Sequence, residues 1–189
     1  MIIKNREGKH MDKEKRHHLT AYEEKLVSRF KAEGLLKSYT ADDWDGVTRN
    51  GGVAVLCSDG DIDAFEHHAK VISRRPHCIK VFGGPLLLAK NYPGYHRPNA
   101  GFLMEQIQAG MEAKKTGTVF LKFHHPCAMA IKYHLDLIQV VGLAHQVHEN
   151  FLRGGLVNPE KIFTFLHVKK KDKQATYLLN PNFVLEKHK

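Results

Sequence analysis

Two short segments of this chain contain side chains that together could hold a transition metal: CSDGD at residues 57–61 and HHPC at residues 124–127. Cys57, His124 and Cys127 would supply two thiolates and an imidazole, the borderline-soft set that zinc prefers. The spacing of His124 and Cys127 lets both converge on one ion at a turn. A fourth tetrahedral position then remains, for the Asp59 carboxylate or for water acidified to a pKa of about 7.

The elements expected around these segments place both of them at the ends of strands. Apolar runs at residues 53–57, 78–83 and 118–123 predict buried strands, followed by strands at 162–167 and 175–179. Helical spacing predicts helices at 20–37, 62–73, 102–115 and 128–153. This alternation predicts an α/β fold with a central, mainly parallel sheet of about five strands flanked by helices and an N-terminal helical arm. Functional groups gather at the carboxyl ends of such strands, where Cys57 and His124 fall.

The two motifs, in this order and after these strands, resemble those of the β-class carbonic anhydrases. That family carries Cys-x-Asp-x-Arg after its first strand and His-x-x-Cys after its third. CIKVFGGPLLLA, from residue 78, resembles the family's second strand and glycine-containing loop, and residues 101–130 resemble its helix, strand and zinc turn. The likeness covers about residues 19–180. It implies zinc ligation by Cys57, His124 and Cys127.

The resemblance also implies an activity and a partner. In an active member, zinc-bound hydroxide attacks carbon dioxide, or a small electrophile such as carbonyl sulfide or carbon disulfide. The resemblance implies that Asp59 would orient this hydroxide here. The family builds homodimers or larger homo-oligomers, so the N-terminal helix is expected to pack on a neighbouring subunit.

One position departs from the family pattern, because Asp61 stands where the family has its arginine. That arginine holds the aspartate away from zinc, whereas a second carboxylate repels it. One expectation is that Asp59 turns onto zinc and closes the site, giving a zinc-stabilised binding or regulatory protein without catalysis. The other is that Arg74 or Arg75 supplies the guanidinium and restores an open site.

The net charge of +9 is concentrated at the two ends of the chain. Residues 1–18 hold six Lys/Arg against three acids, and residues 169–189 hold six against two, so residues 19–168 carry only +2. This distribution disfavours a folded nucleic-acid-binding face. It suggests a basic tail at 1–18 and a tail at 181–189, and the resemblance implies a single zinc-binding domain at 19–180 between them.

The remaining composition predicts a cytoplasmic protein with reduced thiols. The chain has only three cysteines, and this low, odd number argues against a disulfide scaffold. No apolar run approaches the roughly 20 residues of a membrane helix, and the first 18 residues lack the apolar region of a secretory signal. Cys78 is expected in the core. His125 is expected to be structural, with proton shuttling as the alternative.

Overall fold

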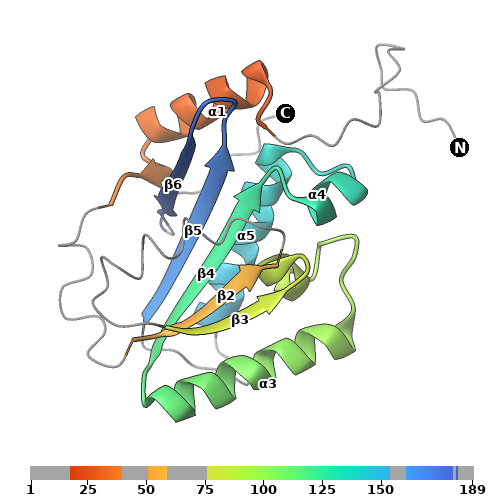
Figure 1. Ribbon diagram of the computed structural model, residues 1–189, viewed down its shortest axis with the longest axis vertical. Helices are drawn as coiled ribbons and strands as arrows, with labels where there is room; N and C mark the ends of the chain where they lie inside the picture. The colour runs from red at the N-terminus through yellow and green to blue at the C-terminus, as the bar shows by residue number, and fades with distance from the viewer. Residues whose placement is uncertain (1–17, 40–50, 59–75, 154–160, 181, 183–189) are drawn as a thin grey trace, which may run out of the picture.

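A six-stranded sheet with the order β1-β6-β5-β4-β2-β3 forms the centre of the fold (Figure 1). The computed structural model describes residues 18–39, 51–58, 76–153, 161–180 and 182. The strands are β1 (Leu36–Lys37), β2 (Val53–Cys57), β3 (His77–Val81), β4 (Thr118–His125), β5 (Lys161–Lys169) and β6 (Gln174–Leu179). The β3, β2, β4 and β5 strands run parallel, while β6 and β1 pair antiparallel. The predicted α/β class with a mainly parallel sheet is confirmed, with six strands rather than five.

Helices pack on this sheet and share one core with it. They are α1 (Ala21–Ala32), the 3-10 helix η2 (Gly84–Leu88), α3 (Arg97–Lys114), α4 (Ala128–Lys132) and α5 (Leu137–Leu152). Figure 1 shows α5 behind the sheet and α3 beside β3. Buried side chains of α1, α3 and α5 join those of β2, β4 and β5 in the main core, while a smaller cluster contains Ala54, Leu56, Phe120 and Phe165. In the described part of the chain, no helix has the length and apolar character to cross a membrane.

Helix α1 begins as predicted but ends five residues early. The Thr20 side chain accepts a hydrogen bond from the Glu23 amide, and the Glu23 carboxylate accepts one from the Thr20 amide, which makes a capping box. The helix was predicted to reach Lys37, and this is wrong. Gly34 adopts a φ of 81°, which turns the chain so that Leu36 and Lys37 pair with β6 instead.

The single helix predicted at 128–153 is also wrong, because the chain forms α4 and α5 with a break between them. His134 has a φ of 56°, a left-handed conformation that stops α4. Asp136 then caps α5 by accepting a hydrogen bond from the Gln139 amide, and Gln139 completes a second capping box. The break leaves α4 as a short element at the tip of β4.

The sheet order brings together the two strands that carry the metal-binding motifs. Strand β2 lies between β3 and β4, so β2 and β4 are hydrogen-bonded neighbours that point the same way.

All eight residues of β4 are buried, and the strand continues to His125, beyond the predicted end at Phe123. Helix α3 begins at Arg97 rather than at Phe102. The predicted helix at 62–73 and the acidic segment from Asp59 lie outside the described residues.

Candidate metal centre

Cys57, His124 and Cys127 meet at the carboxyl ends of β2 and β4, as predicted. Cys57 is the last residue of β2, His124 lies one residue before the end of β4, and Cys127 immediately precedes α4. One ligand atom from each lies within 4.8 Å of the other two. The two Sγ atoms are 4.0 Å apart, close to the roughly 3.8 Å that two sulfurs bound tetrahedrally to one zinc would show. The three side chains could therefore hold one metal ion.

The burial of this group makes a bound cation chemically favourable. Cys127 is 1% exposed and His124 is 7% exposed. A hydrogen bond shared with Cys57 raises the pKa of the Cys127 thiol, as do burial and the Cys57 charge, while the amides of Ala130 and Met129 lower it in part. Two thiolates this close repel each other unless a proton or a cation lies between them. A metal ion bound there displaces the thiol protons and removes the repulsion.

Gly83 and Gly84 bring the backbone after β3 against Cys57. The Gly83 amide, at a φ of 91°, donates a hydrogen bond of 3.2 Å to Cys57 Sγ. A Cβ added at Gly84, where φ is 53°, would lie 2.6 Å from the backbone nitrogen of Cys57. Only glycine allows so close an approach. The glycine pair thus supplies a fixed donor that favours the thiolate form of Cys57.

A buried pair ties α1 to the metal-binding turn. His125 Nε2 lies 2.8 Å from Glu23 Oε1, and both side chains are almost fully buried. Burial raises the pKa of Glu23, but hydrogen bonds from His125 and Thr20 outweigh it and lower that pKa to about 2. Glu23 is therefore a carboxylate at neutral pH. The pair fixes the residue between His124 and Pro126, which supports the expected structural role of His125.

The Tyr92 hydroxyl is a buried polar group near the two thiols. Tyr92 is 2% exposed and packs edge-on against Tyr133, with ring centroids 5.2 Å apart. Within the described part of the chain its hydroxyl has no hydrogen-bond partner. Burial raises the pKa of Tyr92, and Tyr133, Cys127 and Cys57 raise it further. Tyr92 therefore stays neutral and keeps a proton to donate.

His167 on β5 is the sheet neighbour of His124. Its Nδ1 lies 2.8 Å from the Thr176 hydroxyl. Burial lowers the pKa of His167 to about 3, helped by the charges of Lys122 and His124. This imidazole is therefore neutral at physiological pH and adds no positive charge beside the proposed metal ligand.

The structure brings together some of the residues singled out from sequence and leaves others untested. Asp59, the expected catalytic residue and fourth metal ligand, lies outside the described residues, as do Asp61, Arg74 and Arg75. Cys78 was expected in the core, but it is exposed on the edge strand β3.

Sequence reasoning missed four residues around the site: Glu23, Gly83, Gly84 and Tyr92. The adjacent glycines at the end of a predicted strand were a usable signal of close backbone approach. Neither Glu23 nor Tyr92 carried a local signal of a place at this site, because His125 and the two thiols are distant from them in sequence.

No protein-family model matches the chain, and no curated protein sequence matches it. The likeness to carbonic anhydrases therefore rests on the motifs quoted above and on their positions relative to the strands.

Proposed function

We propose that this protein binds one zinc ion through Cys57, His124 and Cys127, in a site of the β-class carbonic anhydrase kind. The observation that carries the proposal is the convergence of three ligand atoms within 4.8 Å from two neighbouring parallel strands. Two sulfurs and one nitrogen match the donors of catalytic and structural zinc sites and are poor ligands for magnesium or calcium.

The reaction that we propose for this site is hydration of carbon dioxide. Zinc held by three protein ligands supplies a Lewis acid that activates water near neutral pH. The chain's own groups would act around it. The Gly83 amide holds Cys57 in place, Glu23 fixes His125 beside the ligand His124, and the buried Tyr92 hydroxyl near both thiols would be available as a hydrogen-bond donor.

A second candidate function is favoured by Asp61, which occupies the place of the family's arginine. Without that arginine, Asp59 is free to become the fourth ligand. A site closed by four protein ligands stabilises the fold but activates no water. The protein would then be a zinc-stabilised binding or regulatory protein.

Stopped-flow measurement of carbon dioxide hydration on zinc-loaded protein, at about pH 7 and pH 9, separates the two functions. The open site predicts turnover in the wild type that Cys57→Ser abolishes. The closed site predicts a wild type with little turnover and a gain of activity in Asp61→Arg. Stoichiometric zinc with no turnover in either protein would rule out hydration and leave the binding or regulatory role.

The expected homo-oligomer stays a prediction. In the isolated chain, Leu26, Val27 and Phe30 of α1 are already buried in the chain's own core. A partner subunit would therefore meet the exposed surface of this helix, where Tyr22 beside the buried face is 65% exposed. Light scattering at micromolar concentration should show at least a dimer, and Tyr22→Lys should weaken it. A monomeric wild type would contradict the expectation.

A further inference from the structure

Two of the three cysteines lie close enough together to form a disulfide. The Sγ atoms of Cys57 and Cys127 are 4.0 Å apart. A disulfide needs them at about 2.05 Å, and turning a cysteine side chain to another staggered position moves its sulfur by a comparable distance. The two residues are 70 positions apart in the chain, so this bond would link the end of β2 to the turn before α4.

The third cysteine, Cys78, is too far from Cys57 to compete. Cys78 pairs with Ala54 of β2 while Cys57 pairs with Val81 of β3, so the two cysteines are three positions apart along neighbouring strands. At about 3.3 Å per residue this offset is roughly 10 Å, beyond the reach of a disulfide. Cys78 is also exposed. It therefore serves as an internal control, a thiol of the same chain that lies outside the pair.

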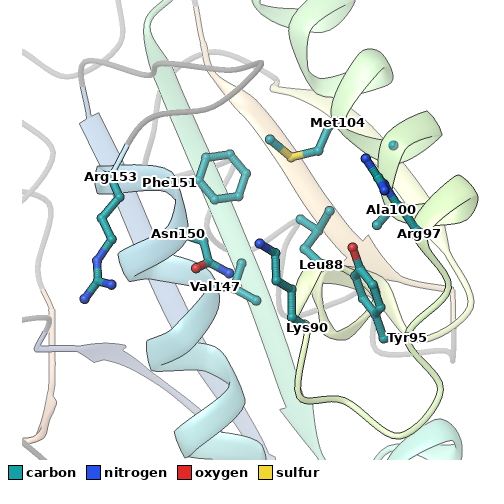
Figure 2. Close-up of a pocket in the computed structure, with 11 residues that line it drawn as sticks. Leu88, Lys90, Tyr95, Arg97, Ala100, Met104, Val147, Asn150, Phe151 and Arg153 are labelled. Atoms are coloured by element: carbon teal, nitrogen blue, oxygen red, sulfur yellow. The ribbon is translucent and has the colours of Figure 1, made fainter.

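The two sulfurs of the pair differ in their access to solvent. Cys57 is partly exposed, whereas Cys127 is 1% exposed. The pocket drawn in Figure 2 lies between α3 and α5, and none of the three cysteines lines it. A molecule held in that pocket therefore meets no thiol. An oxidant reaches Cys57 first, from solvent, and hydrogen peroxide is small enough to do so.

We propose that hydrogen peroxide converts Cys57 and Cys127 into a reversible disulfide, and that this bond and bound zinc exclude each other. The Cys57 sulfur attacks one peroxide oxygen, the O–O bond breaks, and Cys57 becomes a sulfenic acid as the first water leaves. The Cys127 sulfur then attacks the Cys57 sulfur, and the sulfenic hydroxyl leaves with the Cys127 proton as the second water. The two thiols lose two electrons and two protons, and one peroxide becomes two waters.

The exclusion of zinc rests on the proposed zinc site, whereas the disulfide needs only the two sulfurs. Sulfurs bound tetrahedrally to one zinc stay roughly 3.8 Å apart and share their lone pairs with the ion, so zinc slows the oxidation. In the disulfide neither sulfur is a thiolate, and His124 alone of the three ligands remains. Oxidation therefore empties the site, and reduction restores it.

The test treats the zinc-loaded full chain with hydrogen peroxide and follows released zinc with a chromophoric indicator and free thiols after unfolding. We expect two thiols to be lost for each zinc released, so that the thiol count falls from three to one. Peptide mapping should link Cys57 to Cys127, and dithiothreitol should restore the thiols and zinc uptake. Removing zinc with a chelator before peroxide is added should speed the loss of thiols at least tenfold.

Three serine variants separate the roles of the cysteines. Cys78→Ser should lose two thiols at the wild-type rate and keep none. Cys127→Ser should stop at a Cys57 sulfenic acid that dimedone traps, because the second sulfur is missing. Cys57→Ser should form no link within the chain. Cys78→Ser keeps all three metal ligands, so its result does not depend on the folding of the other two variants.

Two results would overturn the disulfide: a link that involves Cys78, or oxidation that ends in a sulfinic acid at Cys57 while Cys127 stays a free thiol. Thiol loss that is as fast with zinc as without it would overturn the exclusion. A chain that takes up no zinc but forms the bond between Cys57 and Cys127 would refute the proposed zinc site and uphold the disulfide, so the two failures are distinct.

Discussion

Replacing Gly84 by alanine tests whether the close backbone contact after β3 builds the metal centre. The new Cβ would lie 2.6 Å from Cys57 N, 2.9 Å from Leu56 C and 3.0 Å from Cys57 Cα. These are backbone atoms of β2, which is held by hydrogen bonds to strands on both sides. We therefore expect η2 to move away from β2, while β2 keeps its place in the sheet. That movement would lengthen the 3.2 Å hydrogen bond from Gly83 to Cys57 Sγ.

The expected cost combines two effects. Alanine at a φ of 53° costs about 1–2 kcal/mol, and the overpacked contact costs about 1–3 kcal/mol. Gly84→Ala should therefore destabilise the metal-free protein by about 2–5 kcal/mol. Loss of the amide donor to Cys57 should also weaken zinc binding by about 10–100-fold, as other losses of groups supporting metal ligands do.

Urea unfolding of metal-free protein and zinc competition with a chromophoric chelator measure the two effects separately. Gly142→Ala is the matched control, because its Cβ meets nothing within 4 Å and the change should stabilise α5 by about 0.5–1 kcal/mol. Wild-type stability and wild-type zinc affinity in Gly84→Ala would refute the claim that this contact shapes the site.

Three further predictions concern other groups at the site. Cys57→Ser should lose most of the bound zinc by elemental analysis, while Cys78→Ser, on the exposed edge strand, should keep it. Because its pKa is lowered from 4.5 to about 2, Glu23 contributes about 3 kcal/mol to stability above pH 4.5, and this is lost as the pH falls toward 2. The stability difference between wild type and Glu23→Gln, from urea unfolding of metal-free protein, should therefore shrink between about pH 5 and pH 3. Tyr92→Phe should leave metal-free stability unchanged or higher but weaken azide binding to the zinc-loaded protein, and unchanged azide affinity would exclude its hydroxyl from the site.

The strands and the three ligands could be predicted from sequence because their signals are local. Five successive apolar residues mark β2, and Cys57 stands at its end. Two thiols and an imidazole at strand ends have few alternative uses. Where two parallel strands are neighbours, their carboxyl ends lie at the same edge of the sheet, so ligands at those ends come close together.

The break between α4 and α5 could not be predicted, because apolar residues keep helical spacing across it. Ile131, Leu135 and Ile138 fit one continuous helix, and the break depends on the backbone conformation of His134. The contact between Glu23 and His125 spans 102 residues, so no local pattern reveals it. Such long-range polar contacts are decided by packing and become visible only in the folded chain.

X-ray absorption at the zinc edge of purified, untagged protein tests the central claim most directly. The account predicts about one zinc per chain, with two sulfur neighbours at about 2.3 Å and nitrogen or oxygen neighbours at about 2.0–2.1 Å. Cys127→Ser should remove one sulfur neighbour or the zinc itself. A folded protein that takes up no zinc, or zinc bound without sulfur, would contradict the assignment of Cys57, His124 and Cys127 as its ligands.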